Sequence, residues 1–219
     1  MIDEQKKEKR VPKNPITYKI SLDEEQKEAK KIVIEKAYSF IHGEAGCGKT
    51  LLACQIALDL IFKREKTKII ITRPSVSTED NGFLPGDLKE KMEPWMVPIK
   101  SNLMKIYDGK KIQSLYEDGT IELIALTHFR GQTFDNAVCI VDEYQNLTRA
   151  QLQMALGRLG QNSIMIFCGD PAQIDLKNRL TSAVHDIEKI SKSEYVHVAT
   201  LTQNHRHEAV KNVLRLLNS

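Results

Sequence analysis

Residues 43–50, Gly43-Glu44-Ala45-Gly46-Cys47-Gly48-Lys49-Thr50, decide the fold. They match the phosphate-loop pattern G-x-x-x-x-G-K-[ST] at every fixed position. The apolar segment 37–42 comes before them and predicts a buried strand, and the helix-forming run 51–58 follows. The alternative, a glycine turn before an ordinary helix, is disfavoured by the full match and by both flanks. The stretch therefore predicts a site for a nucleoside triphosphate.

The chemistry of this loop suits phosphate for a specific reason. Glycines let the backbone curl so that several N–H groups point inward, and the helix N-terminus adds a positive dipole. Lys49 has the length to reach the β- and γ-phosphates, and the Thr50 hydroxyl suits Mg²⁺. We expect ATP and Mg²⁺ as ligands, with nucleotide contacts from nine consecutive residues: Gly43, Glu44, Ala45, Gly46, Cys47, Gly48, Lys49, Thr50 and Leu51.

Length and composition limit the organisation of the chain. Its 219 residues suit one large α/β domain, and we expect residues 1–15 to form a flexible basic tail before a single P-loop ATPase domain over 16–219. No apolar run approaches the length of a membrane span, and the lysine-rich start does not resemble a signal peptide. The net charge of +3 is compatible with nucleic-acid binding but does not indicate it.

The cysteines point to a reducing compartment. There are four, Cys47, Cys54, Cys139 and Cys168, and none forms a C-x-x-C pair. Three of them lie in apolar segments, which is typical of reduced core thiols. We therefore expect a cytoplasmic protein without disulfides or zinc.

Further apolar segments alternate with helical ones. Strands are predicted near 68–72, 121–126, 137–141, 163–168 and 195–201, with helices near 22–35, 148–159, 182–190 and 207–217. For the first helix, Ser21 with Glu24 resembles a capping box. Continuous apolar strands separated by helices predict an α/β fold, with a mostly parallel sheet covered by helices on both faces.

A second half of the site follows the segment 138–141. Four apolar residues end in Asp142-Glu143, which is the Walker B pattern. Asp142 would hold Mg²⁺, while Glu143 would orient and deprotonate an attacking water, which favours hydrolysis over transfer to an acceptor. The alternative is an Asp-Glu pair that caps a helix.

The segment Gly169-Asp170-Pro171-Ala172-Gln173 follows the next buried strand. An amide both donates and accepts hydrogen bonds, so Gln173 suits a sensor of the γ-phosphate or of the attacking water. By itself the segment would be interpreted as an ordinary turn.

Several segments together resemble the PhoH family, in order and spacing, from about residue 20 to the end. Tyr144 departs from the family pattern, which usually has Ala there. The family is similar to the first core domain of superfamily one helicases. The segments that carry the resemblance are 72–74, 82–88 with 93–94, 129–134, 141–146 and 169–176.

The resemblance implies a RecA-like sheet in which the strand ending at Cys168 lies between the phosphate-loop and Walker B strands. It implies that Gln26 contacts adenine, and that Gln145 and Gln173 lie around the γ-phosphate. It also implies that Arg206, in the segment 201–206, reaches that phosphate. Catalytic roles are thus expected for Lys49, Glu143, Gln173 and Arg206.

The resemblance also suggests RNA or single-stranded DNA as a partner. Arg73 and Arg130 lie at or near predicted strand ends, where such helicases touch the strand, and a guanidinium suits phosphate. Four aromatic residues offer stacking, although core or loop packing is the simpler interpretation: Phe83, Trp95, Phe129 and Phe134. His205 and His207 lack a third ligand for a metal.

The leading hypothesis is therefore an ATPase that remodels, or moves along, RNA or single-stranded DNA. The alternatives are a small-molecule or nucleoside kinase, and a slow nucleotide-dependent switch or assembly factor. Only 13 residues follow Arg206, so we expect no second core domain and no added nuclease or RNA-binding domain. A neighbouring copy would then complete the cleft, and the resemblance implies a homo-oligomer, with six subunits in a ring.

Overall fold

The computed structural model describes residues 16–74 and 88–217, and the side chains of the latter range from residue 97 onward. Its centre is a six-stranded sheet with the strand order β3-β2-β4-β5-β1-β6, in which every neighbouring pair runs parallel. The strand β5 lies between β4 and β1, so the expected place of the strand ending at Cys168 is confirmed. The strands are β1 Tyr38–Gly43, β2 Lys68–Thr72, β3 Ile121–Leu123, β4 Ala137–Asp142, β5 Ile164–Gly169 and β6 Val196–Leu201.

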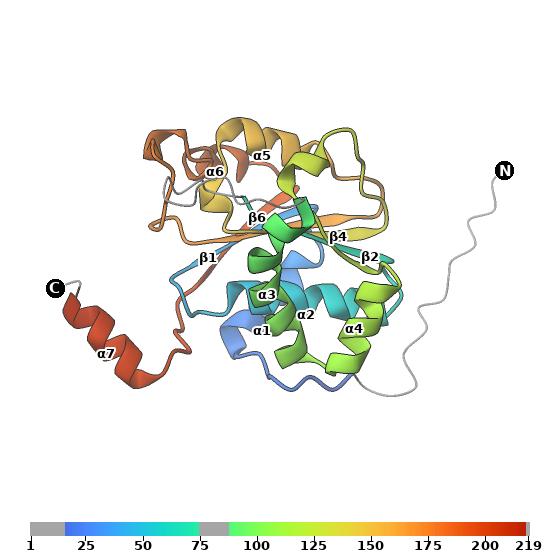
Figure 1. The fold of residues 1–219 in the computed structure, drawn as a ribbon. Helices are drawn as coiled ribbons and strands as arrows, with labels where there is room; N and C mark the ends of the chain where they lie inside the picture. Colours follow the sequence, from blue (N-terminus) through green and yellow to red (C-terminus); the bar gives the residue numbers. More distant parts are fainter. Residues whose placement is uncertain (1–15, 75–87, 218–219) are drawn as a thin grey trace.

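Helices cover both faces of this sheet, as the alternation of apolar strands and helices predicts (Figure 1). One layer holds α1 to α4, the other holds α5 and α6, and α7 extends away from the body of the molecule. The α-helices are α1 Glu24–Val33, α2 Lys49–Phe62, α3 Leu88–Ile106, α4 Gly109–Glu117, α5 Arg149–Leu156, α6 Val184–Ile190 and α7 Glu208–Leu217. Short 3-10 helices are η1 Leu126–Phe129, η2 Tyr144–Asn146 and η3 Arg179–Thr181.

Each face of the sheet has its own apolar core. On one side α1, α2, α3 and α4 pack against alternate residues of the strands, including Ile41, Ile69 and Ile140. On the other side α5, α6 and η1 pack against Phe40, Phe167 and their neighbours. Every residue of β4 and β5 is buried, which explains why these strands have continuous apolar sequences.

The register of the strands aligns their carboxyl ends at one edge. Residue 43 of β1 is opposite Leu201 of β6, while His42 is opposite Gly169 of β5. Asp142 of β4 is opposite Cys168, and Thr72 of β2 is opposite Val141. Loops that follow different strands therefore meet at this edge, which is where ligands bind in open α/β sheets.

Two local predictions were wrong. The capping box of α1 uses Asp23 and Gln26, not Ser21 and Glu24: the Asp23 carboxylate accepts from the Gln26 N–H at 2.7 Å, and Gln26 Oε1 accepts from the Asp23 N–H at 3.2 Å. Asp and Gln satisfy the same two backbone donors as Ser and Glu do, so the sequence allowed both positions. The strand expected over 121–126 ends at residue 123, because η1 follows three residues later.

The segment before α1 is anchored to α2 by a polar cluster. Asp59 of α2 is buried and accepts hydrogen bonds from both the Tyr18 hydroxyl and the Lys30 ammonium group. Burial and the adjacent Asp59 raise the pKa of Tyr18, so its hydroxyl keeps its proton. This cluster fixes the last turn of α1, and the segment before that helix, against the C-terminal half of α2.

None of the helices described in the structure is long and apolar enough to span a membrane. The tail 1–15 and the segment 75–87, which includes Phe83, lie outside the described residues.

Candidate nucleotide-binding site

The phosphate loop joins β1 to α2, as its sequence predicts. Gly46 has a φ of 100° and Gly48 a φ of 81°, which are left-handed values that favour glycine. Gly48 is the residue before the first turn of α2, so the free N–H groups of that turn face the loop. The loop has the backbone shape and the dipole that bind phosphate.

Lys49 lies over this loop. Its ammonium group donates to the backbone oxygen of Gly43 at 2.7 Å and to that of Glu44 at 3.0 Å. These carbonyl groups hold the charge at the mouth of the loop, where an anionic phosphate would gain most from it. The arrangement fits the predicted role of Lys49.

The two predicted magnesium ligands are in contact. The Thr50 hydroxyl donates to Asp142 Oδ1 at 2.7 Å, although the residues are far apart in sequence. Burial raises the pKa of the Asp142 carboxyl, and the neighbouring Glu143 raises it further. A hydroxyl and a carboxylate are hard oxygen ligands, so this pair fits Mg²⁺.

Glu143 is held in place by an amide. The Nε2 group of Gln145 donates to Glu143 Oε2 at 2.7 Å, and Gln145 Oε1 accepts from the Asp170 N–H at 3.3 Å. Gln145 is buried, so its orientation is fixed. Glu143 has a φ of 55°, an uncommon value for a residue other than glycine, and such backbone strain is frequent at functional sites.

Arg73 lies beside both acidic residues. Its guanidinium is 3.5 Å from Glu143 Oε1 and 4.0 Å from Asp142 Oδ2. Arg73 immediately follows β2, which is the neighbour of β4 in the sheet. The structure therefore brings this predicted nucleic-acid contact to the acidic side of the nucleotide site.

The segment after β6 packs on the phosphate loop of the same chain. His205 N–H donates to the Gly46 carbonyl at 3.0 Å, and the Asn204 amide donates to the Ala45 carbonyl at 3.5 Å. A methyl group at Gly46 would lie 2.6 Å from Cγ of Arg206, so the arginine stem lies directly on the loop. Arg206 is thus close to the site within its own chain.

Gln26 also reaches the loop, from α1. Its Nε2 group donates to the Cys47 carbonyl at 3.1 Å, and it would be 2.6 Å from a methyl group at Gly48. The same amide closes the capping box of α1, so the helix start and the loop are fixed relative to each other. Its position beside the nucleotide loop is compatible with the predicted adenine contact.

In the ranges that the structure describes, the remaining predicted residues make no hydrogen bond or ion pair with the phosphate loop or the acidic pair. Gln173 lies in the turn after β5, where its N–H donates to the Asp170 carbonyl at 3.0 Å and its side chain is exposed. Arg130 is exposed and directly follows η1. Phe129 and Phe134 are buried and pack edge-to-face with ring centroids 4.9 Å apart, so they are core residues. The side chain of Trp95 lies outside the described part of the structure.

Two pairs near the site escaped the sequence analysis. His42, just before the phosphate loop, shares a 2.5 Å hydrogen bond with the hydroxyl of Tyr144. His205 Nε2 lies 2.8 Å from Asp23 Oδ2. The only available signal for the first pair was that Tyr144 departs from the family pattern, while nothing in the sequence connects the second pair.

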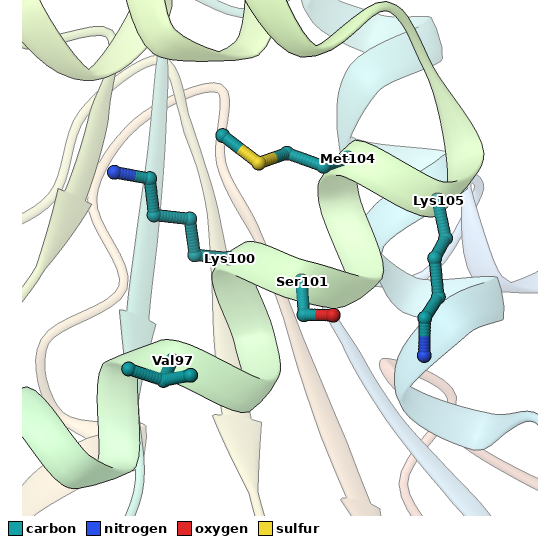
Figure 2. Close-up of a pocket in the computed structure, with 5 residues that line it drawn as sticks. All are labelled: Val97, Lys100, Ser101, Met104 and Lys105. Carbon is teal, nitrogen blue, oxygen red and sulfur yellow. The ribbon is translucent and has the colours of Figure 1, made fainter.

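A shallow hollow elsewhere on the surface is separate from this site. Figure 2 shows that its lining comes from α3 alone, and it includes no predicted site residue. The lining residues are Val97, Lys100, Ser101, Met104 and Lys105.

A phosphate loop and an acidic pair that meet at the carboxyl edge of a parallel sheet define a P-loop NTPase with the RecA-like fold. The order of the strands and the alignment of their carboxyl ends agree with that class. The chain belongs to the PhoH family: the family described as PhoH-like protein matches residues 20–218.

Curated relatives support the same assignment. The chain is 42% identical over 168 residues to a PhoH-like protein of Synechocystis sp., covering 76% of this chain and 51% of the relative. It is 39% identical over 170 residues to Protein PhoH of Escherichia coli, covering 76% and 48% respectively. The chain thus spans about half the length of the curated relatives it matches.

Among solved structures, the Pif1 helicase of Candida albicans has a similar fold. The superposition has a TM-score of 0.52 and covers 91% of this chain and 44% of the helicase, with 17% sequence identity. This likeness concerns the fold alone, and it agrees with the RecA-like sheet described above.

Proposed function

We propose that the protein binds ATP with Mg²⁺ at this site and hydrolyses it. The observation that carries the proposal is the position of Glu143. Its carboxylate is held by Gln145 next to the Thr50–Asp142 pair. A fixed carboxylate beside the magnesium ligands is the arrangement that a water-activating base requires.

Each residue at the site has a role in this proposal. Mg²⁺ would neutralise charge on the phosphates, held by Thr50 and Asp142. Lys49 would bind the β- and γ-phosphates, and Glu143 would take a proton from the attacking water. The kinase alternative lacks this kind of support, because a base beside the metal ligands favours water as the acceptor.

Four further residues complete the proposed site. Gln26 would contact adenine, and Gln145 would respond to the γ-phosphate through its bond to Glu143. Gln173 is exposed at the carboxyl edge, where its amide would reach the phosphate or the water. Arg206 would stabilise charge that develops on the phosphoryl group, since its stem already lies on the loop.

We also propose that hydrolysis serves movement along, or remodelling of, RNA or single-stranded DNA in the cytoplasm. The helicase-like fold and the exposed Arg130 support a nucleic-acid partner. The four cysteines are buried and free, in agreement with a reducing compartment.

Assembly is a separate part of the proposal. A homo-oligomeric ring, of six copies by family resemblance, would let a neighbouring copy complete the nucleotide cleft. The contact between Arg206 and Gly46 supports action of Arg206 within its own chain. Mixing Lys49→Ala protein with Arg206→Ala protein decides this point: activity should not recover despite subunit exchange, whereas partial recovery would place Arg206 in the site of a neighbour.

ATP hydrolysis, measured with and without single-stranded RNA or DNA, tests the proposal. Stimulation by a single strand supports it, and phosphorylated metabolite without free phosphate would support a kinase. Slow turnover that no strand stimulates would favour a switch. Glu143→Gln should keep ATP binding and lower hydrolysis roughly 10²-fold or more, while Lys49→Ala should also weaken binding. Normal turnover of Glu143→Gln would contradict the role of Glu143.

A further inference from the structure

Arg73 lies beside the two acidic residues of the nucleotide site, a position that binding of nucleic acid would not require. Its guanidinium faces the carboxylates of Asp142 and Glu143 at 4.0 Å and 3.5 Å. The position follows from the topology, because Thr72 of β2 pairs with Val141 of β4 and both strands end at the same edge of the sheet. Arg73 comes directly after Thr72, and the acidic pair Asp142-Glu143 comes directly after Val141.

Arg73 brings a fixed positive charge to two adjacent carboxylates. Asp142 is buried, and Glu143 follows it directly in the chain, so both carboxylates lie close to the one guanidinium. A guanidinium remains charged at any physiological pH and presents several donors in one plane, so it can face two carboxylates at once.

Glu143 is thus held from two sides. Gln145 binds one carboxylate oxygen, Oε2, and Arg73 lies beside the other, Oε1. A base that must meet a water molecule in one geometry depends on such support.

We propose that Arg73 is a positioning residue of the ATPase site, which orients Glu143 and offsets the charge of the acidic pair, and that it is not a nucleic-acid contact. The inference rests on the proposed hydrolysis of ATP. Arg130 differs from Arg73 because it is exposed, and it keeps its predicted role in binding single strands.

Basal hydrolysis, measured without nucleic acid, gives the first test. Arg73→Ala should lower kcat roughly 10–100-fold with little change in KM, because misplacing a catalytic group costs about that much. Arg73→Lys should restore part of the loss through its charge. Arg149→Ala is the matched control: this exposed arginine forms a 3.4 Å ion pair with Asp186 outside the site, and its removal should leave kcat unchanged.

A double-mutant cycle shows whether Arg73 acts through Glu143. If it does, adding Arg73→Ala to Glu143→Gln should cause little further loss in single-turnover hydrolysis. If the double variant instead shows the product of the two single losses in rate, the inference is overturned, because Arg73 would then act independently of Glu143. Arg73→Gln, which keeps most of the side-chain volume, replaces the alanine variant if that variant melts early.

Single-strand binding supplies the contrasting measurement. Arg73→Ala should bind a fluorescent single-stranded RNA or DNA as the wild type does, while Arg130→Ala should bind it more weakly. Unchanged kcat in Arg73→Ala would overturn the inference, with or without weaker binding of the strand. Failure of the proposed function is distinguishable, because wild-type protein would then release no phosphate from ATP.

Discussion

The substitution Tyr144→Phe removes one oxygen atom and tests a buried hydrogen bond next to the nucleotide site. Tyr144 is fully buried, and its hydroxyl shares a 2.5 Å hydrogen bond with His42 Nε2. Its ring packs against Phe40 with centroids 5.3 Å apart and against Phe167 at 6.2 Å. Tyr144→Phe keeps these ring contacts and deletes only the hydrogen bond, so the change isolates one interaction.

The magnitude follows from the geometry. The substitution removes a short hydrogen bond and leaves the half-buried His42 nitrogen without this partner, which lowers the free energy of unfolding by about 1–2 kcal/mol. In a chain of this length the melting temperature should fall by about 2–8 °C. Tyr144→Ala should cost more, about 3–5 kcal/mol, because it also leaves a cavity.

Thermal unfolding at neutral pH, followed by circular dichroism, measures the effect. Tyr195→Phe is the matched control, because Tyr195 is 61% exposed and its hydroxyl should contribute little to stability. If Tyr144→Phe melts at the wild-type temperature, the hydrogen bond between β1 and η2 does not stabilise the fold, and this reasoning fails.

Three other predictions concern glycine, pH and salt. A methyl group at Gly169 would lie 2.4 Å from Oε1 of Gln145, the residue whose Nε2 group donates to Glu143, so Gly169→Ala should sharply lower ATP hydrolysis. Gly157→Ala, whose nearest contact would be 3.4 Å, should be tolerated. Burial lowers the pKa of His42, so the unfolded chain binds this proton first and stability is lost as pH falls below about 6.5. His42→Gln should reduce that loss in melts from pH 7.5 to 5.5, whereas His128→Gln, at an exposed position, should not. Single-strand affinity, measured by fluorescence anisotropy, should fall steeply as salt rises, and a flat response would argue against phosphate contacts.

The features predicted correctly from the sequence depend on local patterns. The phosphate loop needs its glycines, its lysine and two flanking elements, all within about 25 consecutive residues. Asp142 and Glu143 were recognisable because an apolar strand ends there. Thr50 and Asp142 were each predicted as magnesium ligands from their own motifs, and the structure shows that the two side chains are in contact.

The features that escaped prediction depend on which strands are neighbours and on choices between equivalent residues. Arg73 faces the acidic pair because β2 lies beside β4, and local patterns do not reveal strand order. His42 and Tyr144 meet across β5 although they lie 102 residues apart. The capping box of α1 was placed two residues too early because Ser21 and Asp23 are comparable caps.

The position of β1 in the sheet has a consequence for synthesis of the chain. This strand leads directly into the phosphate loop, yet its two neighbours are β5 and β6, which come later in the chain than the other described strands of the sheet. Until residues 164–201 have been made, Phe40 and Ile41 lack the partners that bury them. Pairing over such sequence distances is slow, and unpaired apolar strands are prone to aggregate. The phosphate loop is therefore translated well before the two strands that flank β1, and it gains its final shape only after they have been made.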